Sequence, residues 1–97
     1  MKTSKVVVPW REGLHLRYAA RLVQASKSFR SKISLKCDRK MADLRSIISI
    51  LSLCATMGTT IDIEAVGDDE ADATRAVEQI FSVQSQPAPT GDQVQQG

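Results

Sequence analysis

KISLKCDRKMADL, at residues 32–44, carries the clearest structural signal in this 97-residue chain. Polar and apolar residues alternate strictly over residues 32–37, which is typical of a β-strand with one buried face. Asp38-Arg39 predicts a tight turn, and residues 40–44 predict a short strand that returns beside the first. A chain of this length is expected to form one small domain, and the hairpin indicates that the domain contains an antiparallel sheet.

Two more strands are predicted on either side of this hairpin. Residues 5–8 contain three β-branched valines in a row and stop at Pro9, which predicts a first strand. Residues 60–66 alternate again and end at Gly67, which predicts a last strand.

Three helices are predicted between and after the strands. The first begins near His15 or Leu16, and a period of 3.6 puts four apolar residues along one side: Leu16, Ala19, Ala20 and Val23. Leu22, Ser26 and Phe29 are expected close to that side. Residues 46–53 fit a helix or a strand; Ser46 as an N-cap and a stop at Met57-Gly58 favour a short helix. The last helix follows the acidic residues 68–70 and is expected to bury Ala73, Val77, Ile80 and Phe81.

The order of these elements predicts an α+β fold. We expect a two-layer open-faced sandwich, in which three helices cover one face of a four-stranded antiparallel sheet. From about Gln84 the sequence becomes rich in Gln, Pro and Gly. We therefore predict a domain over residues 1–84 and a disordered polar tail over residues 85–97.

The charge distribution and the aromatic content indicate which kinds of partner the chain suits. The net charge of +2 combines +9 over residues 1–45, from 12 Lys/Arg against 3 Asp/Glu, with −7 over residues 46–97. The basic half suits an acidic protein partner, although ordinary solvated surfaces explain it equally well. Aromatic residues make up only 4% of the chain, so nucleic acid is not an expected ligand.

Other features of the sequence argue against a membrane protein, a secreted protein and a cysteine-based metal or redox site. No apolar run is long enough for a membrane helix, and no signal peptide is recognised, so we expect a cytoplasmic protein. Cys37 and Cys54 fit no metal or redox spacing and are interpreted as two reduced thiols. No metal and no cofactor is expected.

The only histidine, His15, lies in the stretch Gly13-Leu14-His15-Leu16-Arg17. A bend at Gly13 directs the imidazole outward, the free N–H groups at a helix start attract anions, and Arg17 offers a planar donor fork to phosphate oxygens. This arrangement is typical of a phosphoryl-accepting site. A lone histidine at a helix start is otherwise a surface or capping residue, and that alternative stays open from these residues alone.

Several motifs occur together in an order that resembles the HPr family, the histidine-containing phosphocarriers of the bacterial phosphoenolpyruvate-dependent phosphotransferase system. They are the 13–17 stretch, the residues Ala19-Ala20-Arg21-Leu22-Val23, Arg45-Ser46-Ile47-Ile48 and Gly67-Asp68-Asp69-Glu70, and the resemblance spans about residues 4–83. It implies an HPr-like sandwich and a carrier that is transiently phosphorylated on histidine, as distinct from a stand-alone enzyme. Phosphorylated enzyme I would donate the group to Nδ1 of His15, Arg17 would stabilise it, and a IIA domain would receive it in sugar transport or its regulation. The protein is expected to act as a monomer.

The resemblance also implies regulatory and docking residues. Ser46 matches a serine that HPr kinase/phosphorylase modifies in one branch of the family, although it also serves as a helix cap. The docking surface for enzyme I and IIA domains would consist of Leu16, Ala20, Ile47, Ile48 and Leu51, although apolar residues at helical spacing are more often core. A non-catalytic regulatory binding protein on the same scaffold, controlled by Ser46 phosphorylation or by partner docking, is the alternative function.

Tyr18 departs from the pattern, because many members have proline there. Its phenol is expected beside His15, where it would bind the phosphoryl group, shield the imidazole or alter the choice of partner. Trp10 either packs under its loop or lies at the rim of the site.

Overall fold

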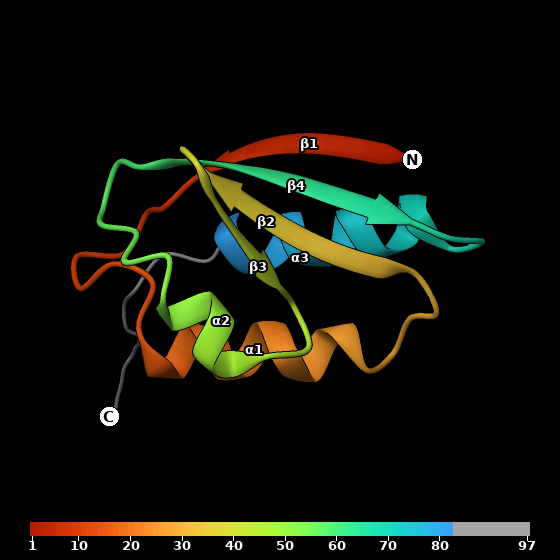
Figure 1. Cartoon of the computed structure of the whole chain (residues 1–97), viewed down its shortest axis with the longest axis horizontal. Coiled ribbons are helices and arrows are strands. Elements are labelled where there is room, and N and C mark those ends of the chain that lie inside the picture. The colour runs from red at the N-terminus through yellow and green to blue at the C-terminus, as the bar shows by residue number, and fades with distance from the viewer. Residues whose placement is uncertain (83–97) are drawn as a thin grey trace, which may run out of the picture.

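The computed structural model describes residues 1–82, so the tail predicted at residues 85–97 and the predicted domain end at residue 84 lie outside the described residues. Seven elements follow one another along the chain (Figure 1): β1 Lys2–Val7, α1 Leu16–Ser26, β2 Lys32–Cys37, β3 Lys40–Asp43, α2 Ile47–Leu51, β4 Thr60–Val66 and α3 Glu70–Ser82.

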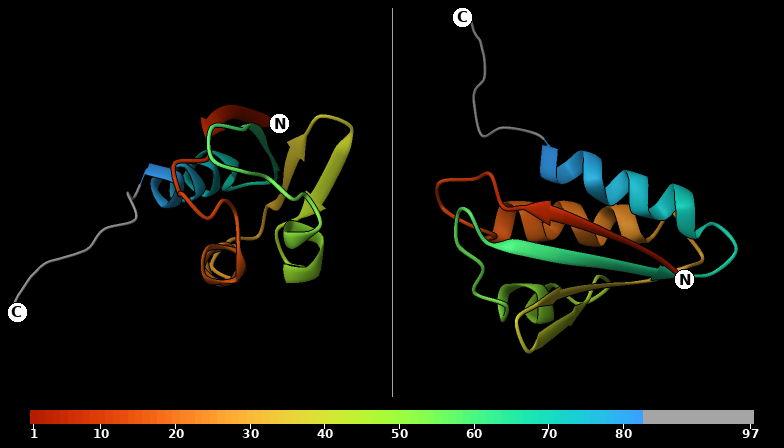
Figure 2. Two further views of the ribbon diagram at one scale, coloured as in Figure 1. Left: turned by 90° about the vertical axis from the view of Figure 1, so that its left-hand side faces the viewer. Right: turned by 90° about the horizontal axis from the view of Figure 1, so that it is seen from above.

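The four strands form one antiparallel sheet in the order β1-β4-β2-β3. The three helices lie on one face of it, and the other face is left open, as the end-on view in Figure 2 makes clear. The predicted α+β open-faced sandwich is therefore confirmed.

The alternating strands occupy the positions predicted for them. β2 buries Ile33, Leu35 and Cys37, and β4 buries Ile61, Ile63 and Ala65. Every second side chain points at the helices, so the alternation in sequence becomes one apolar and one polar face. The predicted turn at Asp38-Arg39 joins β2 to β3, and Asp38 adopts a left-handed φ of 56°. β3 ends at Asp43, one residue before the predicted end.

The prediction for the first strand was wrong at both ends. Residues 5–8 were expected, but β1 runs from Lys2 to Val7 and pairs with β4 along its whole length. β1 is an edge strand with a solvated outer face, so its polar residues 2–5 are compatible with the ladder although they give no apolar signal.

α1 starts where predicted, but its buried side differs from the predicted one. Buried residues are Tyr18, Ala19, Leu22 and Ser26, whereas Leu16 and Ala20 are exposed. α1 packs against both α2 and α3, as Figure 1 and Figure 2 indicate. Its contact side is therefore set by these two neighbours, which the apolar period of one helix does not reveal.

α2 is shorter than predicted, and one residue of α3 is less buried. α2 ends at Leu51 and not at residue 53, and the chain then turns through Cys54, whose φ is 52°. In α3, Ala73, Val77 and Phe81 are buried as predicted, but Ile80 is only half-buried against the core.

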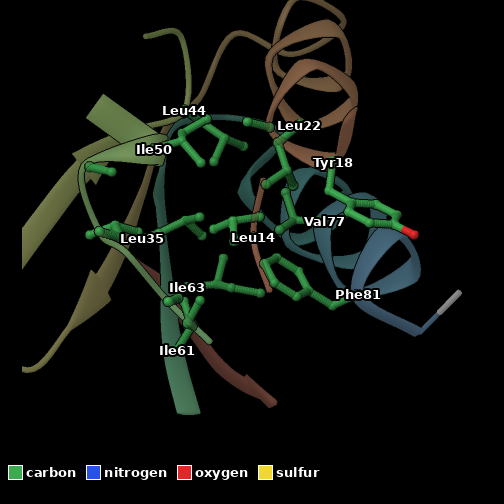
Figure 3. Packing of buried hydrophobic residues seen from close by; sticks show 14 of the residues in the cluster. Leu14, Tyr18, Leu22, Leu35, Leu44, Ile50, Ile61, Ile63, Val77 and Phe81 are labelled. Atoms are coloured by element: carbon green, nitrogen blue, oxygen red, sulfur yellow. The ribbon is translucent and has the colours of Figure 1, made fainter. Parts of the chain in front are cut away.

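The core fills the space between the sheet and the helices. Figure 3 shows that Leu35, Ile61 and Ile63 from the sheet face Leu22, Val77 and Phe81 from the helices. The interior is mostly aliphatic, and three of the four aromatic rings, those of Trp10, Tyr18 and Phe81, gather at the end of α1 that carries His15.

Asp69 joins two distant segments at the start of α3. Its carboxylate accepts hydrogen bonds from the Ser31 hydroxyl at 2.5 Å, the Ser31 amide at 3.0 Å and the Arg30 amide at 2.9 Å. These donors, above all the Ser31 hydroxyl, hold the pKa of Asp69 below its ordinary value. The ionised carboxylate therefore stabilises the link between the α1–β2 connection and α3.

We expect Asp69→Asn to flatten the acid limb of the stability curve. The pKa is lower in the folded than in the unfolded protein, so the stabilisation is present above the ordinary aspartate value of about 3.9 and is lost as pH falls through the folded value. Urea unfolding between about pH 6 and pH 3 should show a smaller loss of unfolding free energy in Asp69→Asn than in the parent protein. Asp72→Asn, which removes an exposed carboxylate of α3, is the control; equal slopes in all three proteins would contradict the assignment.

Candidate functional site

His15 is held at the start of α1 by the loop before it. It is the N-cap residue, with an extended φ of −110°, and its carbonyl accepts the Ala19 amide at 2.9 Å. Gly13 turns the chain with a φ of 78°, and the Leu14 amide donates to the Ala55 carbonyl at 2.9 Å. The loop before α1 is therefore fixed against the loop between α2 and β4, and both lie at one end of the molecule (Figure 1).

The imidazole of His15 is partly exposed, with 39% of its side-chain surface open to solvent. Its Nδ1 accepts the Arg17 amide at 3.4 Å, so Nδ1 carries a lone pair in this arrangement. Its Nε2 faces the Glu12 carboxylate, with 3.9 Å between Nε2 and Oε1. The geometry thus directs the lone pair of Nδ1 at the Arg17 amide in the first turn of α1.

Arg17 is exposed on the same turn of the helix. Its backbone amide already faces Nδ1, and its guanidinium belongs to no ion pair within residues 1–82. An anion bonded to Nδ1 would therefore meet a helix N-terminus and a free cationic side chain.

Tyr18 lies beside His15, as predicted, but its ring is buried and not exposed at the surface of the site. Its side chain is 3% exposed, and its ring stacks on Trp10 with the centroids 3.8 Å apart and the planes at 5°. Trp10 is fully buried, so it packs under its loop and does not lie at the rim of the site. Only the edge-to-face contact with His15, with centroids 5.1 Å apart at 73°, connects Tyr18 to the imidazole. The two residues are three apart on a helix start, and this spacing was the signal available in the sequence.

The five predicted docking residues do not form one uniform surface. Leu16 and Ile48 are 61% and 70% exposed, and Ala20 is also exposed. Ile47 and Leu51 are half-buried and pack against the core. α1 and α2 contact each other, and their three exposed apolar residues, Leu16, Ala20 and Ile48, are here called the α1–α2 patch. Leu16 follows His15 directly in the chain.

Ser46 is the N-cap of α2. Its hydroxyl accepts the Ser49 amide at 3.2 Å, and the Ser49 hydroxyl accepts the Asp43 amide at 2.9 Å. The capping role read from the sequence is present, and the half-buried Ser46 hydroxyl stands at the amides of a helix start.

The remaining candidates for chemistry are few in the part of the chain that the structure describes. Cys37 is buried, Cys54 is exposed, and both are free thiols. Residues 1–82 contain no group of three His, Cys, Asp or Glu side chains that could hold a metal ion. No helix within residues 1–82 is long and apolar enough to cross a membrane.

Comparison with known proteins identifies the arrangement. Residues 2–83 match the protein family described as PTS HPr component phosphorylation site. This chain belongs to the HPr family. HPr proteins are phosphocarriers of the phosphotransferase system, so the chain is a phosphocarrier of that system.

Individual HPr relatives agree in sequence and in fold. Phosphocarrier protein HPr of Xylella fastidiosa is 32% identical over 81 residues, covering 84% of this chain and 91% of the relative. HPr of Thermoanaerobacter tengcongensis superposes with a TM-score of 0.80 at 34% identity, covering 84% of this chain and 92% of the relative. Crh of Bacillus subtilis, a catabolite repression protein described as a domain-swapped dimer, gives a TM-score of 0.68 at 33% identity, covering 84% of this chain and 94% of Crh.

Proposed function

We propose that His15 is the phosphoryl-accepting residue of this phosphocarrier and that it accepts the group at Nδ1. The observation that carries the proposal is the lone pair of Nδ1 facing the amides of α1 from an imidazole that is partly open to solvent. Phosphorylated enzyme I is the proposed donor, and a IIA domain in sugar transport or its regulation is the proposed acceptor.

The transfer requires one bond to form and one to break. The Nδ1 lone pair attacks phosphorus while the P–N bond to the donor histidine breaks and its electron pair returns to the donor imidazole. The Arg17 amide that now meets Nδ1 is then placed to donate to a phosphoryl oxygen. Because the site is exposed, the group stays accessible to the next acceptor.

The proposal is tested by incubating the protein with enzyme I, phosphoenolpyruvate and Mg²⁺ and following its intact mass. We expect a gain of one phosphoryl group that is lost on acidification, because a P–N bond to imidazole is acid-labile. Peptide mapping of the phosphorylated protein should place the group on residue 15. No gain in a folded sample with the cognate enzyme I would contradict the proposal.

Arg17 is proposed to stabilise the charge that develops on the phosphoryl oxygens. Arg17→Ala is expected to slow transfer from phosphorylated enzyme I by about 10- to 100-fold, since a planar charged donor at the reacting group is lost. Arg21→Ala is the matched control, because Arg21 is an exposed cation one turn further along α1. Equal slowing in both variants would assign the effect to general electrostatic steering of the basic surface.

The α1–α2 patch is proposed as the docking surface for enzyme I and IIA domains, with Ile47 and Leu51 supporting it from below. Two strongly exposed apolar side chains, Leu16 and Ile48, lie on two helices that contact each other, and Leu16 belongs to the basic half of the chain. This combination suits a partner with an apolar centre and an acidic rim.

Ile48→Ser is expected to raise the KM for enzyme I by about five- to tenfold without a comparable change in kcat, because an exposed anchor at the centre of an interface is removed. Val66→Ser is the control. Val66 is 52% exposed at the end of β4, which lies at the opposite end of the molecule from the start of α1 (Figure 1). A KM for Ile48→Ser equal to that of the control would place docking elsewhere.

The second candidate is a regulatory binding protein controlled at Ser46, and the likeness to Crh favours testing it. A phosphate on Ser46 would lie at the amides that begin α2 and add negative charge beside the docking surface. Treatment with HPr kinase/phosphorylase and ATP should then add an acid-stable phosphoryl group that Ser46→Ala does not receive. Uptake of phosphate at Ser46 and none at His15 would favour this second function.

The carrier is further proposed to act as a monomer in the cytoplasm. Because Crh is described as a domain-swapped dimer, the oligomeric state of this chain is best measured directly by sedimentation. A dimer at micromolar concentration would contradict the monomer proposal.

A further inference from the structure

Three aromatic rings from three parts of the chain form a stack directly beneath the imidazole. Tyr18 of α1 stacks on Trp10 of the preceding loop, and Trp10 contacts Phe81 of α3 with centroids 5.1 Å apart at 30°. Figure 3 shows Tyr18 and Phe81 projecting from their two helices. The ring of Tyr18 then meets His15 edge to face at 5.1 Å and 73°. The imidazole is therefore the exposed end of a continuous aromatic column.

The column is buried everywhere except at His15. Trp10 is fully buried, and Tyr18 and Phe81 are each 3% exposed. The two other contacts of the imidazole are weaker, because the Glu12 side chain is 60% exposed and the Arg17 amide is 3.4 Å from Nδ1. Of these three interactions of the imidazole, the one with Tyr18 is made to a side chain that is itself buried and stacked.

We propose that Tyr18 is a positioning residue, whose ring holds the His15 imidazole in the orientation in which Nδ1 accepts a phosphoryl group. This inference rests on the proposed function of His15. An imidazole at a helix N-cap turns about its Cβ–Cγ bond, and only some orientations direct Nδ1 at an incoming phosphorus. A fixed aromatic ring at a steep angle restricts that rotation, so less orientation is lost when donor and acceptor meet.

In this proposal the aromatic ring of Tyr18, and not its hydroxyl, orients the His15 imidazole. No hydrogen bond joins the Tyr18 hydroxyl to another side chain or backbone group of residues 1–82. Tyr18→Phe is therefore a matched control that keeps the stack, whereas Tyr18→Leu keeps an apolar side chain and removes the ring.

The experiment measures kcat and KM for phosphoryl transfer from enzyme I in both variants, together with the ring proton shifts of His15 by NMR. Tyr18→Phe should stay within about twofold of the parent protein. Tyr18→Leu should lower kcat by about three- to tenfold with little change in KM, and the His15 protons should lose the ring-current shift caused by Tyr18. Folding is followed by the fluorescence of Trp10, the only tryptophan.

The outcomes separate this inference from the proposed function. A folded Tyr18→Leu that transfers as fast as the parent would overturn the inference and leave His15 as the acceptor. A Tyr18→Phe as slow as Tyr18→Leu would assign the effect to the hydroxyl and also overturn it. If the parent protein takes up no phosphoryl group, the proposed function fails whatever the variants do.

Should Tyr18→Leu not fold, Phe81→Leu removes the far end of the column without touching His15. We then expect a smaller fall in kcat, with a measurable shift of the His15 ring protons. Unchanged kcat and unchanged shifts in folded Phe81→Leu would overturn the inference.

Discussion

Replacement of His15 by asparagine is expected to abolish phosphoryl uptake from enzyme I and phosphoenolpyruvate while leaving the fold intact. Asparagine removes the only imidazole in the chain, so no nitrogen nucleophile of this kind remains. Asparagine is also a good N-cap residue, so the start of α1 keeps an acceptor for the Arg17 amide. The unfolding free energy should therefore change by less than about 0.5 kcal/mol.

The control for this experiment is Glu12→Gln, which replaces the carboxylate that faces Nε2 of His15. This variant should still gain one acid-labile phosphoryl group. Intact mass at matched times, read with thermal unfolding of each variant, distinguishes a lost nucleophile from a lost fold. An acid-labile phosphoryl group on His15→Asn would show that another residue accepts it. This outcome would remove the basis for placing the reaction at the start of α1.

The parts of the fold that sequence predicts well are those in which one segment carries its own signal. β2 and β4 alternate between a buried and a solvated face, so their bounds were predicted correctly. Ser46 was predicted to cap a helix because an N-cap hydroxyl bonds to amides only a few residues away. Local periodicity and local hydrogen bonding need no knowledge of the rest of the chain.

The parts that sequence predicts poorly depend on partners far along the chain. β1 extends back to Lys2 because β4, more than 50 residues later, offers a ladder for its polar residues. The buried side of α1 is displaced from the apolar side because α2 and α3 flank it. Propensity and period describe a single element, and these features are decided by neighbouring elements.

The candidate site divides in the same way. The motif at residues 13–17 and its resemblance to HPr predict His15 and Arg17 as site residues, and both lie at the start of α1. The surroundings of the imidazole were not predicted, because the burial of Tyr18 depends on Trp10 and Phe81, which are 8 residues before it and 63 after it. That Tyr18 lies beside His15 was predicted, whereas the stack of rings that buries Tyr18 was not.

Gly13→Ala is expected to cost about 3 kcal/mol of unfolding free energy and to slow phosphoryl transfer in whatever protein remains folded. A Cβ at this position would lie 2.5 Å from the Ala55 carbonyl oxygen and 3.2 Å from the Thr56 Cα. Both are backbone atoms that cannot turn aside, so the loop before His15 must move. That movement would break the hydrogen bond from the Leu14 amide to the same Ala55 carbonyl, and the position of His15 depends on this bond.

The variant Gly58→Ala shows how much of the stability lost in Gly13→Ala comes from the steric clash and how much from the positive φ. Gly58 also has a positive φ, 90° against 78° for Gly13, but a Cβ there would meet nothing within 4 Å. Gly58→Ala should therefore show only the conformational cost of about 1 kcal/mol and transfer at nearly the parent rate. Urea unfolding followed by Trp10 fluorescence gives both free energies, and the difference between the two variants measures the contact between the loops. If Gly13→Ala were no less stable than Gly58→Ala, the loop that carries His15 would not be held against Ala55, and the observed orientation of Nδ1 would need another cause.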